Sequence, residues 1–401
     1  MKDIDKKTRF ALFALAATFF AIGVTEFISV GVLPAVSEDF GVSTSTAGLV
    51  TSIYALGVAI GAPVLAMATR SVDKRTSILG AIAVFAVAHV MIAAAPTFPV
   101  LLAGRFIAAT AHGLLFALSS TIAAELVGES RQARAIAFVF GGFTIATAIG
   151  APAGTAVGAL VGWRVPFAAI AVLAVAAFAL NAVTLPRRTP AQNAPQPARL
   201  SHQLALLREK HVLTALSMTV LGYGGTFATF TYLSPILEDV TGVPAGAVSL
   251  ILVLYGVSIA AGNLWGGRLG DADPVKALLA IFGTQTVALL AFYFTAHILA
   301  LALINIVVLG VLAFMSVPIL QSYVLTLAKS YAPQSIELAS SLNITSFNLG
   351  IFLGSSLGGA AVAVTGLAST ALVAAALLAA AVLLAVAGVP MERRRLALAT
   401  A

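Results

Sequence analysis

The sequence predicts an all-α membrane protein in which twelve transmembrane helices form two pseudo-symmetric six-helix halves. Only 9% of the 401 residues are charged and 60% are hydrophobic, whereas about a quarter of the residues of a soluble domain are charged. The apolar runs reach the length of about 20 residues that spans a bilayer as a helix. They are too long and unbroken for a membrane β-barrel, whose strands alternate polar and apolar residues.

Breaks at charges, prolines and polar clusters divide the chain into twelve predicted spans. These spans are 10–35, 46–69, 76–95, 99–123, 134–160, 165–185, 211–237, 244–267, 274–296, 298–327, 338–364 and 367–389. The first span follows the polar stretch MKDIDKKTRF and lacks a small-residue cleavage site. We therefore expect an uncleaved first helix and not a secretory signal peptide.

The longest polar interruption, residues 186–210, contains four prolines and follows the sixth span. This composition is typical of a linker that cannot continue a helix. We therefore predict an N-terminal six-helix bundle over 1–185, a cytoplasmic linker, and a C-terminal six-helix bundle over 211–401.

The Lys and Arg residues are distributed unevenly between the two sides of this layout. All of them except Arg105 and Arg164 fall on the side of the N-terminus. Basic loops stay in the cytoplasm, so we expect a multi-pass protein of the cytoplasmic (inner) membrane with both termini inside. Because these charges lie on separate loops without interleaved aromatic residues, the net charge of +7 does not indicate a nucleic-acid partner.

The two halves share residues at a nearly constant offset. Pro34, Gly41, Tyr54 and Gly61 recur 201 residues later as Pro235, Gly242, Tyr255 and Gly262. The glycines at 150, 154 and 158 recur at 350, 354 and 358. Both halves begin from the same side of the membrane, so the repeats are parallel. Two such halves with a site at their interface are typical of transporters.

Within the spans and away from their ends, only Glu26 and Arg105 are formally charged. Counted from Pro34 and Pro99 at 1.5 Å per residue, they lie at depths of about 12 and 9 Å. Opposite charges at similar depth predict mutual pairing or a shared water-filled cavity for proton coupling. The alternative is a static ion pair that locks two helices together.

Histidines offer a further candidate for proton transfer. His112 follows Arg105 by seven residues and projects from nearly the same helix face, where it could relay protons or bind substrate. An ordinary interhelical hydrogen bond is the alternative. His89 and His297 have no comparable partners in the sequence, so we expect both to be structural.

Uncharged polar residues of the second half offer candidates for the substrate cavity. The seventh span mixes Tyr223, Thr226, Thr229 and Tyr232 with phenylalanines, which suits the wall of an amphiphile pocket as well as a buried core face. Amides within spans often join helices, and each is also a candidate for the cavity: Gln285, Asn305, Asn343 and Asn348.

Small residues in the fifth span predict close helix packing. Gly150, Gly154, Gly158 and Gly162 lie on one helix face and let another backbone approach. Pro152 bends or loosens the helix between them. A tight and bendable seam between the halves would suit rocking between two states.

Longer stretches of the chain resemble the major facilitator superfamily. Within it, the chain is similar to the twelve-helix drug/proton antiporters of the arabinose-efflux-permease-like and chloramphenicol-exporter-like branch. The resemblance rests on TEFISVGVLP at 25–34, SIYALGVAIGAP at 52–63 and RFIAATAHG at 105–113, with TFATFTYLSPIL, GNLWGGRLGD and ASSLNITSFNLG in the second half.

This resemblance implies roles for particular residues. It assigns proton coupling to Arg105 and conformational change to the fifth-helix residues Gly141, Gly150, Pro152 and Gly154, although Ala151 stands where the family pattern has glycine. The loop between the second and third spans keeps Arg70 but lacks the Asp and Gly of the family's gate signature. The copy in the second half keeps GGRLGD, with Asp271.

These observations predict proton-coupled efflux of small amphiphilic molecules by alternating access. The alternative is an exporter or facilitator for a sugar or nucleoside without obligatory proton coupling. An enzyme is not expected, because the spans offer no nucleophile–base pair, clustered acids or metal ligands. We expect a monomer that uses the proton gradient, with no metal, no cofactor and no Gly-rich ATP-binding loop.

Overall fold

The computed structural model describes residues 5–127, 131–186, 208–269, 273–331 and 335–400. Within these ranges, twelve helices are long and apolar enough to cross a membrane, which confirms the twelve predicted spans. The predicted linker lies mostly outside the described residues, and so does Asp271.

The first six spans contain ten helical segments, counted over the described residues. They are α1 Lys6–Gly31, α2 Leu33–Phe40, α3 Thr44–Ala47, α4 Leu49–Ala68, α5 Lys74–Ala93, α6 Phe98–Glu125, α7 Gln132–Ile145, the π-helix η2 Ala146–Gly150, α8 Ala151–Val161 and α9 Arg164–Thr184. The later spans contain α11 Lys210–Phe230, α12 Leu233–Pro235, the π-helix η3 Ile236–Val240, α13 Ala245–Leu269, α14 Pro274–Thr295, α15 Leu299–Tyr331, α16 Ile336–Thr365, η5 Leu367–Ser369 and α17 Thr370–Thr400.

Short polar signals in the sequence set several helix ends. Asp5, Asp73 and Asp273 precede α1, α5 and α14, and each carboxylate accepts a hydrogen bond from the backbone N–H three residues later. This cap satisfies a donor that the first turn leaves unpaired. Gly162 and Gly366 end α8 and α16 at φ angles of 97° and 92°, a conformation that glycine adopts without steric cost.

Packing between the helices divides the chain into two compact units. The first unit comprises residues 1–192 and 245–253, and the second comprises residues 193–244 and 254–401. One boundary between them, at residues 253 and 254, therefore falls within α13.

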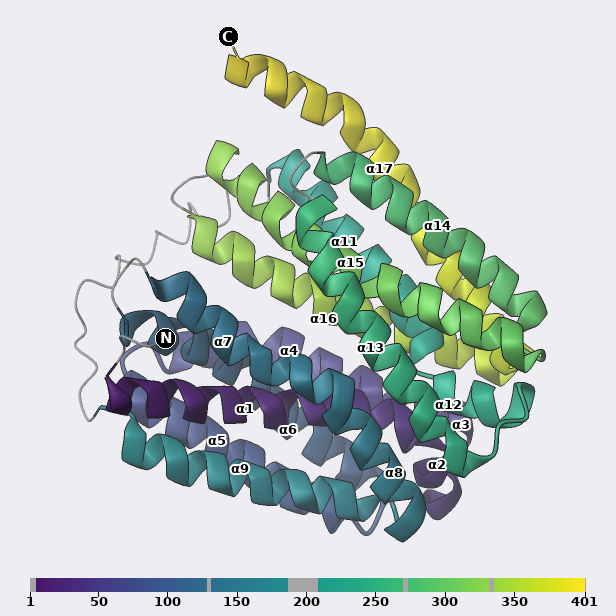
Figure 1. Cartoon of the computed structure of the whole chain (residues 1–401), viewed down its shortest axis with the longest axis horizontal. Coiled ribbons are helices and arrows are strands. Elements are labelled where there is room, and N and C mark those ends of the chain that lie inside the picture. Colours follow the sequence, from purple (N-terminus) through teal and green to yellow (C-terminus); the bar gives the residue numbers. More distant parts are fainter. Residues whose placement is uncertain (1–4, 128–130, 187–207, 270–272, 332–334, 401) are drawn as a thin grey trace. The chain divides into compact units, whose positions relative to one another are not determined.

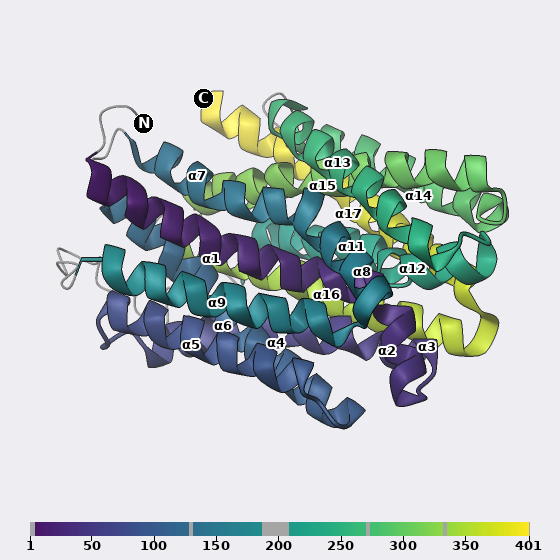
Figure 2. The same ribbon diagram turned by 60° about the horizontal axis from the view of Figure 1, so that its bottom comes forward.

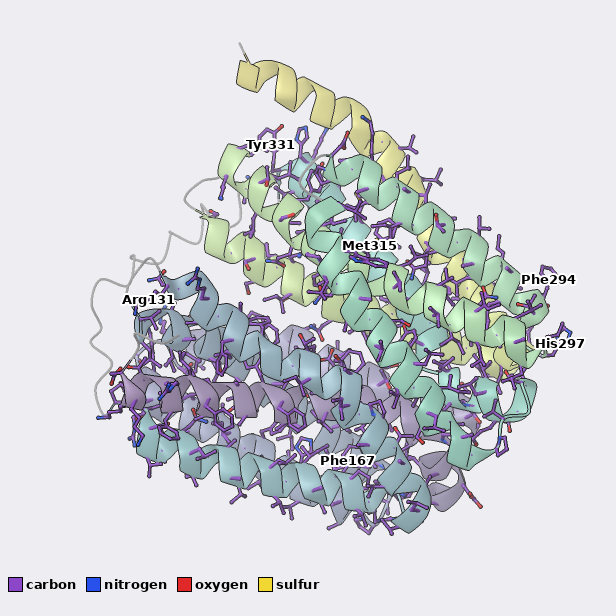
Figure 3. The ribbon with its side chains drawn as sticks, in the orientation of Figure 1. Arg131, Phe167, Phe294, His297, Met315 and Tyr331 are labelled. Atoms are coloured by element: carbon purple, nitrogen blue, oxygen red, sulfur yellow. The ribbon has the colours of Figure 1, made fainter. Side chains whose placement is uncertain are left out.

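In the first unit, α1 is the most enclosed helix. It packs against α6, α7, α8 and α9, and Figures 1 and 2 show it between α7 and α9. Helix α6 also packs against α4 and α5. Aromatic side chains fill the space between these helices, among them the fully buried Phe19, Phe85 and Phe167. Arg131 lies at the end of this unit where α1 begins (Figure 3).

In the second unit, α11 packs against α15, α16 and α17, and α14 packs against α15 and α17. Helix α13 lies against α15 at Gly262 and Gly266, where an added Cβ would come within 2.0 Å of the Val311 carbonyl oxygen and 2.2 Å of that of Met315. Phe294 and His297 lie at one end of this unit and Tyr331 at the other (Figure 3).

The glycines of the fifth span pack within the first unit, against α1. A Cβ at Gly150 would lie 2.5 Å from Val24, one at Gly154 would lie 2.4 Å from Ile28, and one at Gly158 would lie 3.0 Å from Val32, the residue directly after α1. The seam that we expected between the halves is thus formed with α1 of the same unit. In the second unit, the glycines at 350, 354 and 358 lie in the same way against α11.

The helix that carries this seam changes its hydrogen-bonding pattern midway. The π-helical segment Ala146–Gly150 joins α7 to α8, and Pro152 is the second residue after it. Proline has no N–H to donate to the preceding turn, and single π-turns inside α-helices are a known response to such interruptions.

Adjacent glycines on α7 provide a test of this packing. A Cβ at Gly142 would lie 2.1 Å from the Ala16 carbonyl oxygen, whereas one at Gly141 meets nothing within 4 Å. We expect Gly142→Ala to lower the free energy of unfolding by about 1–3 kcal/mol, because the α1 backbone must move. Gly141→Ala should be neutral or slightly stabilising. Thermal unfolding of the two variants in detergent measures this difference, and equal midpoints would contradict the close contact.

Candidate functional site

Arg105 lies on α6 and its side chain is completely buried. Its Nε donates to the Val50 carbonyl oxygen at 3.2 Å, and its Nη1 donates to the carbonyl and hydroxyl oxygens of Thr25 at 3.0 and 3.1 Å. The guanidinium carbon lies 3.9 Å from the centre of the Tyr54 ring. Arg105 therefore links α6 to α1 and α4 through charged hydrogen bonds and a cation–π contact.

Glu26 follows Thr25 on α1. Its side chain is partly exposed, although every other residue from 21 to 30 is buried. Among the described residues, no ion pair within 4.0 Å joins it to Arg105, and the Nη2 of Arg105 has no hydrogen-bond partner. Consecutive helical residues point about 100° apart. The carboxylate is thus adjacent to the arginine site without being its partner.

His89 joins the same cluster from α5. Its Nδ1 lies 2.7 Å from the Phe85 carbonyl oxygen, which can only accept, so we assign the ring proton to Nδ1. Its Nε2 lies 2.7 Å from the Thr25 hydroxyl and in this tautomer accepts a hydrogen bond from it. The Thr25 hydroxyl therefore donates to His89 and accepts from Arg105.

The sequence led us to expect a structural role for His89 and offered it no comparable partner, although it contains a signal that could have placed His89 in this cluster. It lies six residues before Ala95 at the end of the third span, which corresponds to a depth of about 9 Å. That depth is similar to the depths of Glu26 and Arg105. Depth matching, extended from charged residues to histidine, would have placed His89 with them.

His112 reaches the cluster through Tyr54. Its Nδ1 lies 3.0 Å from the Tyr54 hydroxyl, and its side chain is buried. The Tyr54 ring in turn lies against the guanidinium of Arg105. The structure therefore brings Thr25, Tyr54 and both histidines together around Arg105 inside the first unit.

The second-half candidates do not share one cavity. Thr226 and Thr229 line a cavity of about 20 Å³ inside the second unit. Tyr232 is fully buried, and its hydroxyl donates to the Ser355 carbonyl oxygen at 3.0 Å. Tyr223 packs in an aromatic cluster with Phe227, Phe314 and Phe347.

The two asparagines of α16 also lie outside this cavity. Asn343 accepts from the Thr219 hydroxyl at 2.8 Å and donates to the Gln321 side chain at 2.6 Å. Gln321, which sequence reasoning missed, extends the network to Ser340. Asn348 donates to the Ile344 carbonyl oxygen of its own helix at 3.0 Å. Asn343 therefore joins α11, α15 and α16, as an interhelical amide does.

At the end of the first unit where α1 begins, charged side chains form contacts between neighbouring helices. Arg70 is exposed at the end of α4. Lys74 forms an ion pair with Glu125, and the Nη2 of Arg75 donates to the Ala182 carbonyl oxygen near the end of α9 at 2.6 Å. These contacts tie α5 to α6 and α9 at the level of the loop that resembles the gate signature.

Comparison with known proteins gives the family. The family model described as Major Facilitator Superfamily matches residues 15–335. The inner membrane transport protein YdhP of Escherichia coli (strain K12) is 38% identical over 89% of this chain and 90% of its own. A chloramphenicol resistance protein of Streptomyces lividans is 36% identical over 86% of this chain and 92% of its own.

The fold is also found among solved structures. An inward-facing, occupied bacterial homologue of the human lysosomal transporter Spinster matches with a TM-score of 0.78 and 15% identity over 96% of this chain and 98% of its own. The chain belongs to the Major Facilitator Superfamily. It is a multi-pass inner-membrane transporter and not an enzyme.

Proposed function

We propose that this member of the Major Facilitator Superfamily exports small amphiphilic molecules in exchange for protons. The observation that supports this most directly is Glu26, a partly exposed carboxylate within the otherwise buried stretch 21–30 of α1, next to the buried Arg105. Ionisable groups inside membrane spans are costly and typically serve transport. The similarity to a chloramphenicol resistance protein supports the export direction.

In this mechanism, Glu26 binds and releases the coupling proton. Water reaching the carboxylate from one compartment or the other changes the free-energy cost of its charge, so the site can take a proton outside and release it inside. Arg105 sets the local field from a fixed position, because Thr25, Val50 and Tyr54 hold its guanidinium. The protein would carry the proton inward in one half of the alternating-access cycle and the solute outward in the other half.

The topology and the substrate class are part of the proposal. Both termini face the cytoplasm, because the loops at the N-terminal side hold nearly all the Lys and Arg residues. The monomer is the transporting unit. Few fixed charges and many aromatic residues in the spans suit neutral or weakly cationic amphiphiles.

Proton movement distinguishes this function from that of a facilitator for neutral solutes such as sugars or nucleosides. We expect a pulse of chloramphenicol outside weakly buffered proteoliposomes to raise the internal pH, because solute entry through an antiporter drives protons out. A pH-sensitive dye trapped inside measures this change, with protein-free liposomes as the control. Protein-dependent uptake of labelled chloramphenicol with constant internal pH would instead identify a facilitator.

A further inference from the structure

The cavity of about 20 Å³ in the second unit lies between α11, α13, α14 and α15. This volume holds about one water-sized group. Two buried polar atoms on its lining residues have no hydrogen-bond partner in the described part of the chain: Gln285 Oε1 and Thr229 Oγ1. The Thr226 hydroxyl is satisfied, because it accepts from Gln285 Nε2 at 3.0 Å and donates to the Gly222 carbonyl oxygen at 3.1 Å. Such orphaned buried atoms call for an explanation.

The 201-residue repeat relates this cavity to the arginine site of the first unit. Thr226, Tyr255 and Ile306, which all line the cavity, follow Thr25, Tyr54 and Arg105 by 201 residues. In each half the threonine has a hydrogen-bond partner from the third span, although the direction differs: Gln285 donates to Thr226, whereas His89 accepts from Thr25.

Close helix contacts at glycines support the same correspondence. Gly57 of α4 meets Ala109 of α6, and 201 residues later Ser258 of α13 meets Gly310 of α15. Gly61 meets Thr110, and Gly262 meets Val311. The two helix pairs therefore pack in the same register. The cavity occupies the place where the first unit holds the guanidinium of Arg105.

At this place the second unit has no counterpart of the guanidinium to donate to Gln285 Oε1, which can only accept, whereas the Thr229 hydroxyl can both donate and accept. Ile306 cannot donate a hydrogen bond, and none of the ten residues that line the cavity is charged. The rest of the lining is apolar and aromatic, including Phe230, Leu289 and Phe292. A group that satisfies Gln285 Oε1 must therefore be small and carry an O–H or N–H donor, and the apolar lining around it favours a donor attached to an apolar body.

We infer that this cavity binds one hydroxyl or ammonium group of an amphiphilic solute, held by Gln285 Oε1 and Thr229 Oγ1. The inference rests on the proposed function in taking that solute to be the transported one. It adds a hydrogen-bond donor to the chemical description of the substrate. A water molecule presents the same donor chemistry, and the experiment separates the two sources.

Three probes with the same ring and two-carbon chain test the inference: 2-phenylethanol, phenethylamine and ethylbenzene. With the full chain in lipid nanodiscs, we expect saturating alcohol or amine to raise the thermal unfolding midpoint by about 3 °C more than ethylbenzene does. Gln285→Leu should abolish this difference, and so should Thr229→Val, which keeps the shape and removes the hydroxyl. Gln321→Leu, a matched substitution on α15 outside the cavity, should retain it.

Three results would overturn the inference. Equal shifts from all three probes, or a difference that survives both cavity variants, would show that no donor is recognised here. An experimental map with only a water between Gln285 and Thr229, together with no probe-induced shift, would make this a hydration site alone. The assay uses no gradient and no transport, so it fails or succeeds independently of proton coupling at Glu26.

Discussion

Glu26→Gln is expected to reduce pH-gradient-driven transport at least about 100-fold, the scale on which a positioned proton-transfer group contributes. Glutamine keeps the size and polarity of the side chain but cannot bind and release a proton. Exchange of solute for solute should persist, since the substitution changes neither the cavity of the second unit nor the hydrogen bonds of Arg105. Transport in proteoliposomes, with and without an imposed pH gradient, measures both activities.

Glu38→Gln provides the matched control, because Glu38 is an exposed carboxylate on α2. This variant should transport at the wild-type rate. Glu26→Asp, which keeps an ionisable group on a shorter side chain, should retain part of the coupled activity. Undiminished gradient-driven transport by Glu26→Gln would show that another group carries the coupling proton.

Arg105→Ala is expected to lower the free energy of unfolding by about 3 kcal/mol and to abolish proton coupling. The change removes charged hydrogen bonds to Thr25 and Val50 inside the bundle, each worth about 1.5–3 kcal/mol. It also empties the space over the Tyr54 ring. Unfolding midpoints in detergent and proton flux in proteoliposomes measure the two effects separately.

Arg105→Lys separates the charge from the shape of the guanidinium. Lysine keeps the positive charge, but it lacks the planar fork that bonds to Val50 and Thr25 while stacking on Tyr54. We expect intermediate stability and partial coupling. Arg134→Ala, at an exposed position at the start of α7, should match the wild type. Normal stability and coupling in Arg105→Ala would refute the role assigned to the cluster.

The twelve spans were predictable from the sequence because length and apolar composition suffice to define a membrane helix. The repeat was predictable for a similar reason, since Tyr54 and Tyr255 or Gly61 and Gly262 stand at a fixed offset. Packing partners were harder to predict. The glycines at 150, 154 and 158 indicated a close neighbour, and only the structure identifies it as α1.

The hydrogen-bond partner of Arg105 on α1 could not be predicted from the sequence, and the reason is geometric. Depth placed Glu26 and Arg105 at one level, but a one-residue step along α1 turns the helix by about 100°. That rotation gives the guanidinium the carbonyl and hydroxyl of Thr25 instead of the carboxylate. Gln285 was only one of four amide candidates until the structure placed it against Thr226.

The π-turn at Ala146–Gly150 keeps the small residues of the fifth span facing α1 along the whole contact. In a regular α-helix, residues spaced by four drift about 40° per step, so from Gly142 to Gly158 the contact line would rotate by about 160°, away from its neighbour. One inserted residue reduces that rotation to about 60°. The corresponding stripe on α16 spans only Gly350 to Gly358 and stays continuous without such an insertion. A long straight interface of small residues therefore depends here on a local change of helical pitch.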